Sequence, residues 1–214
     1  MKTVWVSGAS TGIGFATAKK FLNNNWKVII SSSNYEKIIL AKKELLLKSE
    51  NKELYSYKCD ISNRNQVTET VNKITKEIGN INLAILNAAA YTPNKEQDFS
   101  IQNFEKLIDV NLKGTLFCIE SLINNMQNKQ NHIAIMASPV GYRGLPTGAA
   151  YGLTKAGLIN LAESLFFDLK KKKIKISLIN PGFIESELTK LNSFPMPFLK
   201  SADYAAEKIY LGLN

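Results

Sequence analysis

The chain has few of the residues that stabilise disulfide-bonded or metal-binding proteins. It contains two cysteines, Cys59 and Cys118, and one histidine, His132, in 214 residues. Two distant cysteines do not make a disulfide framework, and with a single histidine we expect no metal site. No apolar run approaches the roughly 18 residues of a membrane span, and the N-terminus reaches glycine and serine before the core of a signal peptide could form. We therefore expect a cytoplasmic protein that has no membrane segment.

Length and composition are those of an ordinary globular domain. The 214 residues, 45% hydrophobic and 21% charged, predict a single domain, 1–214, around one buried core. The 27 lysines and arginines exceed the 18 acidic residues and give a net charge of +9, which attracts anions. Because the lysines are scattered and no recognition motif accompanies them, we expect no nucleic-acid binding. The one dense run, 170–173, is expected at a helix C-terminus, where cations are favourable.

Short apolar runs alternate with longer segments of helical period. The runs are rich in β-branched and aromatic residues and predict six strands at 3–7, 26–31, 54–58, 82–86, 132–137 and 175–179. The segments between and after them predict helices at 12–24, 35–49, 63–79, 100–127, 149–171 and 202–213. Apolar strands separated by helices indicate an α/β fold with a doubly wound parallel sheet of the Rossmann type. In such sheets ligands bind beyond the carboxyl ends of the strands.

A glycine-rich turn follows the first predicted strand directly and leads into the first predicted helix. It reads Ser7-Gly8-Ala9-Ser10-Thr11-Gly12-Ile13-Gly14. We expect Gly8 to permit the tight turn, Gly12 to let the backbone approach a pyrophosphate at the helix start, and Gly14 to let helix and sheet pack closely. An ordinary strand-to-helix turn is the alternative, but the position at the first such junction favours a dinucleotide site. The Gly-Lys-Ser/Thr ending of a triphosphate loop is missing.

A tyrosine and a lysine stand four residues apart at the start of the predicted helix 149–171. Tyr151 and Lys155 would therefore share one helix face. A phenol is a poor base at neutral pH, but a neighbouring ammonium favours the phenolate and lowers its pKa toward a range useful for proton transfer. Taken alone, such a pair is usually a solvated surface pair.

The ordered set of motifs, not any single one, carries a resemblance to a known family. The set comprises SGASTGIG after the first strand, CDI at 59–61, LNAA at 86–89, VNLKGT at 110–115, Ser138, YxxxK at 151–155 and NPG at 180–182. With it, the chain resembles the short-chain dehydrogenases/reductases over nearly its whole length. The resemblance implies that Tyr151 is the general acid/base and that Lys155 lowers its pKa and holds the nicotinamide ribose. It further implies that Ser138 binds the substrate oxygen and that Asn111 supports a water leading protons to Lys155.

The resemblance also places most of the cofactor contacts. Asp60 matches the residue that receives the adenine amino group, and Ser62, not Asp60, is expected to cap the next helix. Family members usually have threonine at position 7 and Asn-Asn-Ala-Gly at 86–89; here Ser7 keeps a hydroxyl, and Ala89 requires a backbone without positive φ. The full expected cofactor-binding set is Gly8, Ser10, Thr11, Gly12, Ile13, Gly14, Ser32, Ser33, Asp60, Ile61, Asn87, Ala88, Ala89, Tyr151, Lys155, Pro181, Gly182, Ile184 and Ser186.

The residues after the second strand bear on the choice of cofactor. A carboxylate there would bind the ribose 2′-hydroxyl of NAD(H), but the chain has Ser31, Ser32, Ser33 and Asn34. Three hydroxyls could donate to a 2′-phosphate, and the net charge is positive. These features favour NADP(H) over NAD(H), with NAD(H) remaining an alternative.

The chain is short after Gly182, and a seventh strand is expected to be missing, which leaves a sheet edge exposed or covered by a partner. We expect 183–200 to form a substrate lid. Apolar and aromatic residues in the lid and the facing loop predict a pocket for an apolar or aromatic carbonyl compound, although packing of the shortened end explains them equally well. These residues are Phe183, Phe194, Pro195, Met196 and Phe198 in the lid, and Tyr142, Leu145 and Pro146 opposite. Arg143 either engages an acidic substrate or faces water.

The sequence therefore predicts an oxidoreductase that interconverts a ketone or aldehyde and an alcohol by hydride transfer from or to NAD(P)(H). The alternative is a dinucleotide-binding regulatory or scaffold protein that keeps the fold without the chemistry. By the resemblance, the helices at about 100–127 and 149–171 pair with their copies in a homodimer or homotetramer. Phe117, Leu161, Leu165 and Phe166 suit that pairing or packing on the sheet.

Overall fold

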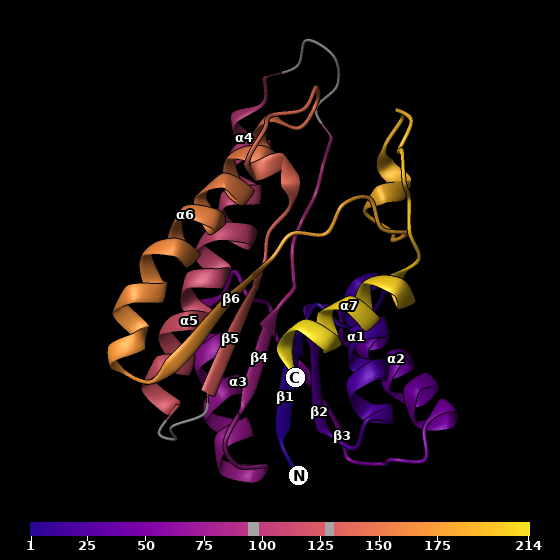
Figure 1. The fold of residues 1–214 in the computed structure, drawn as a ribbon, viewed down its shortest axis with the longest axis vertical. Helices are drawn as coiled ribbons and strands as arrows, with labels where there is room; N and C mark the ends of the chain where they lie inside the picture. Colours follow the sequence, from indigo (N-terminus) through magenta and orange to yellow (C-terminus); the bar gives the residue numbers. More distant parts are fainter. Residues whose placement is uncertain (94–98, 127–130) are drawn as a thin grey trace.

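The structure, a computed structural model that describes residues 1–93, 99–126 and 131–214, is built on one parallel sheet (Figure 1). Its strands, in spatial order β3-β2-β1-β4-β5-β6, are all parallel to their neighbours. The bounds are β1 (Thr3–Ser7), β2 (Lys27–Ser32), β3 (Leu54–Lys58), β4 (Leu83–Leu86), β5 (Asn131–Met136) and β6 (Ile174–Ile179). The strand order reverses between β1 and β4, where a crevice for a ligand opens at the carboxyl ends of parallel strands.

Seven α-helices among the described residues connect or follow these strands. They are α1 (Gly12–Asn23), α2 (Tyr35–Lys48), α3 (Arg64–Glu77), α4 (Ile101–Leu107), α5 (Gly114–Asn125), α6 (Ala149–Lys171) and α7 (Ala202–Leu213). Every predicted strand, and every predicted helix except 100–127, is found with its ends shifted by at most two residues. The lysines at 170–173 lie at the end of α6, as predicted.

The helices cover both faces of the sheet, as Figure 1 shows. On one face, α3, α5 and α6 contribute Val71, Leu122 and Leu158 to a core with Trp5 of β1. On the other, α1, α2 and α7 bury Phe21, Leu45 and Ile209 against the sheet. Apolar residues on both faces of the central strands explain their nearly continuous hydrophobic sequence. The doubly wound Rossmann-type fold is confirmed.

The predicted helix 100–127 is not continuous. It consists of α4, a π-helical stretch Ile108–Lys113 and α5, while residue 127 lies outside the described residues. Asn111 lies in the π-helical stretch and is 1% exposed. Single π-helical turns often occur at functional sites because they re-aim side chains within a helix.

The C-terminal region is short, and the sheet has no seventh strand among the described residues. After β6 the chain runs through an irregular segment, tied by one parallel bridge between Ile184 and Lys200, into α7. Helix α7 packs on α1, with the rings of Phe21 and Tyr210 5.0 Å apart. No helix in the described part of the chain is both long and apolar enough to cross a membrane. The predicted pairing of α5 and α6 with a second copy stays a prediction; Phe117, Leu161 and Leu165 pack partly on the core, whereas Phe166 is half exposed.

Candidate active site

The turn after β1 and the loop after β4 are joined by hydrogen bonds at the switch point. The Ser7 hydroxyl accepts the backbone N–H groups of Asn87 and Ala88, each at 3.1 Å. The Asn87 amide donates to the carbonyl oxygens of Ser7 and Gly8 at 3.1 and 3.0 Å. A Cβ added at Gly8 would lie 2.6 Å from the Ala88 Cα, and Gly8 has a φ of +65°. Serine at position 7 therefore serves through its hydroxyl, and glycine at position 8 is required both by conformation and by space.

Gly12 and Gly14 in the α1 turn leave little or no room for a side chain, which agrees with the close packing expected at Gly14, while the pyrophosphate contact expected at Gly12 stays a prediction. Gly12 has a φ of +58° and its added Cβ would meet the Ser186 side chain at 3.2 Å. At Gly14 an added Cβ would lie 2.4 Å from the Gly8 carbonyl oxygen, so helix and turn pack too closely for any side chain. Ala89 has no positive φ, as predicted.

The N-terminus of α1 is left without a side-chain cap. Asn34, Asn63, Ser100 and Ser201 accept a backbone N–H at the starts of α2, α3, α4 and α7, whereas Thr11, a residue able to cap, makes no such bond at α1. The first N–H groups of a helix carry partial positive charge and bind anions when no side chain satisfies them. The α1 turn, with its small residues and free donors, fits the pyrophosphate of a dinucleotide.

Helix α6 carries the tyrosine and lysine beside a cavity of about 350 Å³. Ser138, Tyr151 and Lys155 all line it, and they come from the end of β5 and the first turns of α6. The Lys155 ammonium donates to the Met136 carbonyl oxygen at 2.8 Å and lies 5.3 Å from the centre of the Tyr151 ring. The predicted helix face is thus confirmed, and its two polar groups point toward the crevice end of the sheet.

The expected direction of the Tyr151 pKa shift is wrong for this structure. Removal from water on burial raises the pKa of Tyr151 well above its usual value, and the nearby Tyr91 raises it further. Burial lowers the pKa of Lys155 to about 8. Lys155 is 2% exposed, and its ammonium donates to the Met136 carbonyl oxygen. Removal from water therefore outweighs any electrostatic attraction between Lys155 and Tyr151. Tyr151 therefore carries its proton at neutral pH.

Asn111 does not line the cavity; its side chain instead forms hydrogen bonds that hold neighbouring residues in place. Its side chain accepts the Ala90 N–H at 2.7 Å and donates to the Ala90 carbonyl oxygen at 3.0 Å. It also donates to the Thr154 hydroxyl at 3.1 Å, and that hydroxyl donates to the Tyr151 carbonyl oxygen at 2.7 Å. We call Ala90, Asn111, Tyr151 and Thr154 the polar frame. It ties the loop after β4 to the first turn of α6.

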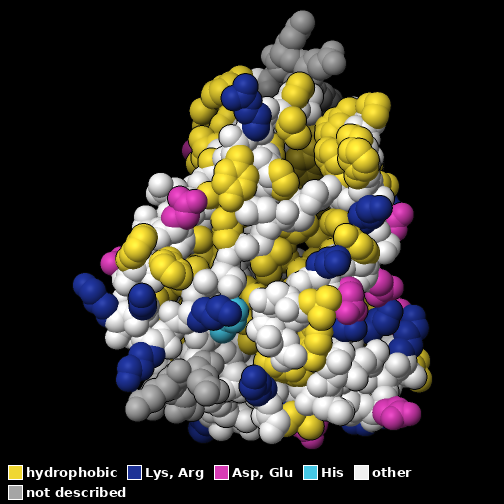
Figure 2. Space-filling view, in the orientation of Figure 1, with side chains coloured by type: hydrophobic (Ala, Val, Ile, Leu, Met, Phe, Trp, Pro, Cys, Tyr) yellow, Lys and Arg dark blue, Asp and Glu magenta, His cyan; other side chains and the backbone are white. Residues whose placement is uncertain are grey.

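Of the remaining predicted residues, one group lines the same cavity and another lies along the carboxyl edge of the sheet. Those in the cavity wall are Ile13, Asn87, Ala89, Pro181, Gly182, Ile184 and Ser186. Those outside the wall are Gly8, Ser10, Thr11, Gly12, Gly14, Ser32, Ser33, Asp60, Ile61 and Ala88. The expected apolar lining is found for Leu145, Pro146, Phe183 and Phe194. Figure 2 shows hydrophobic side chains gathered around a hollow at this end of the molecule.

The sequence did not identify Tyr91, or Asn192 to which it is hydrogen-bonded, as site residues. The Tyr91 ring stands edge-on to that of Tyr151, with centres 5.1 Å apart, and its hydroxyl donates to the Asn192 side chain at 2.7 Å. Both residues line the cavity. A tyrosine placed directly after the 86–90 run was the available signal, but its partner is about a hundred residues away and only the fold brings them together.

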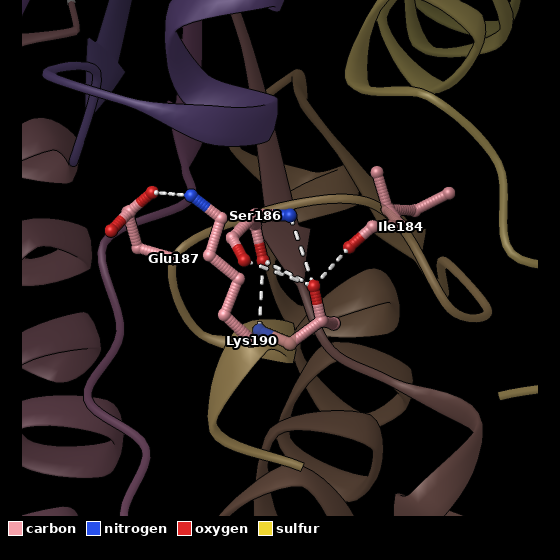
Figure 3. Close-up of polar contacts among 5 residues, drawn as sticks. Ile184, Ser186, Glu187 and Lys190 are labelled. Atoms are coloured by element: carbon pink, nitrogen blue, oxygen red, sulfur yellow. Dashed lines mark hydrogen bonds and ion pairs between the residues drawn. The ribbon is translucent and has the colours of Figure 1, made fainter. Parts of the chain in front are cut away.

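Thr189 organises the start of the segment after β6 and was also missed. Its hydroxyl donates to the Ile184 carbonyl oxygen at 2.8 Å and accepts the Ser186 N–H at 2.9 Å, while the Ser186 hydroxyl accepts the Thr189 N–H at 3.2 Å. Figure 3 shows this cluster, with the ion pair between Glu187 and Lys190 beside it. The two predicted cofactor contacts, Ile184 and Ser186, are therefore fixed by one threonine.

Two details at the carboxyl ends of β2 and β3 differ from expectation. Ser31 is fully buried and its hydroxyl accepts the Trp5 indole N–H at 3.0 Å, so of the three serines at the end of β2 only Ser32 and Ser33 are accessible. Asn63, not Ser62, caps α3. Ser62 instead donates through its N–H and hydroxyl to one Asp60 carboxylate oxygen, at 3.0 and 2.7 Å. The side chain of Ile61 is buried in the core.

Comparison with known proteins agrees with this geometry. The family model described as short chain dehydrogenase matches residues 2–194. The chain is 33% identical over 214 residues to the 3-oxoacyl-(acyl-carrier-protein) reductase FabG of Rickettsia typhi, covering 99% of this chain and 82% of that protein. It is 28% identical to an uncharacterised oxidoreductase of Myxococcus xanthus, covering 99% and 83%.

Solved structures share the whole fold. ElxO with NADP bound is 30% identical, has a TM-score of 0.89, and is matched over 100% of this chain and 91% of that chain. A tyrosine-to-phenylalanine variant of ElxO with NADPH bound gives a TM-score of 0.90 at 29% identity, with the same coverage. The chain belongs to the short-chain dehydrogenase family and is an NAD(P)-dependent oxidoreductase.

Proposed function

We propose that the protein reduces a ketone or aldehyde to an alcohol, or catalyses the reverse reaction, and prefers NADP(H). The observation that carries the proposal is the convergence of Ser138, Tyr151 and Lys155 on one apolar cavity beside the uncapped start of α1. Proximity of a proton donor, an oxygen-binding hydroxyl and a dinucleotide cradle is what carbonyl reduction requires.

In this proposal each side chain has a separate task. Tyr151, which is protonated at neutral pH and whose pKa burial raises further, donates a proton to the carbonyl oxygen. Ser138 donates a hydrogen bond to the same oxygen, its own oxygen being only weakly engaged by the Val140 N–H at 3.4 Å. Lys155 gives up its bond to Met136 for the ribose hydroxyls. The nicotinamide, when bound, supplies or accepts the hydride.

The residues outside the cavity hold the cofactor. The N–H groups of the α1 turn bind the pyrophosphate, and the free oxygen of Asp60 receives the adenine amino group, since the hydrogen bonds from Ser62 involve only the other oxygen. Ile184 and Ser186, held by Thr189, meet the carboxamide. The segment 183–200 serves as the substrate lid.

Preference for NADP(H) rests on the end of β2. Ser32 and Ser33 are accessible, no carboxylate ends the strand, and Lys37 lies in the exposed first turn of α2. A 2′-phosphate there would find hydroxyl donors and the Lys37 ammonium, although Glu36 lies in the same turn of α2. The NADP and NADPH bound to ElxO support the same choice.

The decisive experiment follows cofactor absorbance with NADPH or NADH and a panel of aliphatic and aromatic carbonyl compounds. The wild-type protein should oxidise NADPH with a higher kcat/KM than NADH. Tyr151→Phe should lower kcat by about a thousandfold, within the range for loss of a general acid, while the Kd for NADPH changes little. Turnover by Tyr151→Phe at the wild-type rate would disprove the mechanism.

A further inference from the structure

Arg143 is unusual in this chain because arginine is rare. Of the 27 basic residues only two, Arg64 and Arg143, are arginines, and the other 25 are lysines. Arg64 forms an ion pair with Glu120 on the surface of α3 and α5. Arg143, just after the turn 139–141 that follows Ser138, instead lines the active-site cavity. One of the two guanidinium groups therefore lies in the cavity wall and is exposed to solvent.

The surroundings of Arg143 offer no intramolecular use for its charge. Among the residues that the structure describes, the cavity wall contains no aspartate or glutamate, and its only other charged group is Lys155, which is buried and bonded to Met136. Within the described ranges, 1–93, 99–126 and 131–214, the Arg143 side chain has no hydrogen bond or ion pair. Leu145, Pro146 and Phe194, which line the same cavity, are apolar.

A guanidinium at the rim of an apolar cavity favours the binding of negatively charged ligands. Its planar fork matches the two oxygens of a carboxylate or phosphate, and it is less strongly hydrated than an ammonium. Arg143 is exposed to solvent, so its charge is available to a ligand that enters the cavity. The cofactor phosphates have their own donors at the α1 turn and the end of β2, so Arg143 is free for the substrate.

We propose that Arg143 recognises an anionic group of the substrate, so that the protein acts on carbonyl compounds that carry a carboxylate or phosphate beyond an apolar stretch. This inference rests on the proposed function and narrows it from carbonyl compounds in general to anionic ones. The carbonyl lies at Tyr151 and Ser138, the apolar stretch lies against the cavity wall, and the anion stays at the rim with Arg143.

The test compares anionic carbonyl compounds with neutral analogues that keep the reacting ketone. The carboxylate pair is 4-oxopentanoate and its methyl ester, and the phosphate pair is acetoacetyl-coenzyme A and the neutral acetoacetyl thioester of N-acetylcysteamine. For wild type and Arg143→Ala, kcat/KM is measured for each compound with saturating NADPH. The ratio of anionic to neutral kcat/KM should fall about tenfold in Arg143→Ala, as expected for a hydrogen bond between charged groups, in whichever pair carries the natural anion.

Two further variants separate a specific contact from the general field. Arg143→Lys keeps the charge without the fork and should recover only part of the ratio. Arg64→Ala removes the same charge at the surface pair with Glu120 and should leave the ratio at the wild-type value. Equal losses for anionic and neutral compounds in Arg143→Ala, or an equal effect of Arg64→Ala, would overturn the inference.

A binding measurement keeps this inference distinct from the proposed function. Calorimetry with NADP-loaded protein compares hexanoate with hexanamide, neither of which is reduced. Wild type should bind hexanoate more tightly, and Arg143→Ala should lose that difference. If wild type reduces no carbonyl compound at all, the proposed function fails, while the hexanoate comparison still decides whether Arg143 binds anions; equal binding of the two ligands to wild type contradicts the role of Arg143.

Discussion

Two regions face each other across the cavity, and they are held in different ways. On the sheet side, Asn111 is 1% exposed and Lys155 2%, and the polar frame joins a loop, a π-helical turn and α6 through four hydrogen bonds. Across the cavity, within 183–200, only Ile184 is buried, and Phe198 is 88% exposed. That segment is attached through the bridge of Ile184 to Lys200, the Thr189 cluster and the Tyr91–Asn192 bond.

The difference indicates a division of labour. Buried polar groups with every partner in place have one low-energy arrangement, since breaking any bond leaves an unpaired group away from water. That rigidity suits the proton donor, whose position must be accurate. A surface segment with few buried contacts opens at little cost and tolerates change, which suits the selection and exchange of substrates.

Breaking the polar frame should have the largest effect. In Asn111→Leu the Ala90 N–H and C=O lose this partner, and the Thr154 hydroxyl keeps only its bond to the Tyr151 carbonyl oxygen. We expect the free energy of unfolding to fall by about 2 to 3 kcal/mol and kcat to fall about a hundredfold as Tyr151 shifts. Urea unfolding and steady-state kinetics measure both. Asn24→Ala, which removes an exposed amide, is the control; a stable, fully active Asn111→Leu would show that the frame is not needed.

Titration of Lys155 should have the next largest effect. Because burial lowers the pKa of this ammonium to about 8, kcat/KM for NADPH should fall up to about tenfold per pH unit above that value as the charge that holds the ribose is lost. Lys155→Arg, which keeps its charge, should not show the inflection.

Unfolding does not explain this loss. A lysine pKa lowered from 10.5 to about 8 means that the unfolded chain binds the proton more tightly in that window. This group therefore makes the folded chain more stable as pH rises through the window. A pH profile without an inflection near the lowered pKa would contradict the assignment of Lys155.

Loosening the lid should have the smallest effect. Tyr91→Phe removes the hydroxyl bonded to Asn192 but keeps the ring beside Tyr151. We expect the free energy of unfolding to fall by about 1 kcal/mol or less and KM for the carbonyl compound to rise about threefold, with a smaller change in kcat. If kcat fell as far as in Asn111→Leu, the segment 183–200 would be as important for the position of Tyr151 as the polar frame.

Much of the fold and the site could be read from local sequence. The strands and most helices follow from apolar periodicity, and the Gly8, Gly12 and Gly14 spacing predicts the close turn between β1 and α1. The break at Asn111 was not readable, because the π-helical stretch between α4 and α5 is only six residues long, too short to show a period of its own. Nor was the burial of Ser31 against Trp5, since it depends on the register of β1 with β2.

The order of elements and the types of the reacting groups are properties of the sequence itself, because periodicity and motif spacing act over a few residues. The tertiary structure alone decided which way the pKa values of Tyr151 and Lys155 move, what Asn111 braces, and that Arg143 stands at the cavity rim. Burial and nearby charge depend on distant segments brought together by folding. No local sequence pattern therefore indicates how much water those segments exclude from a side chain or which charges they place beside it.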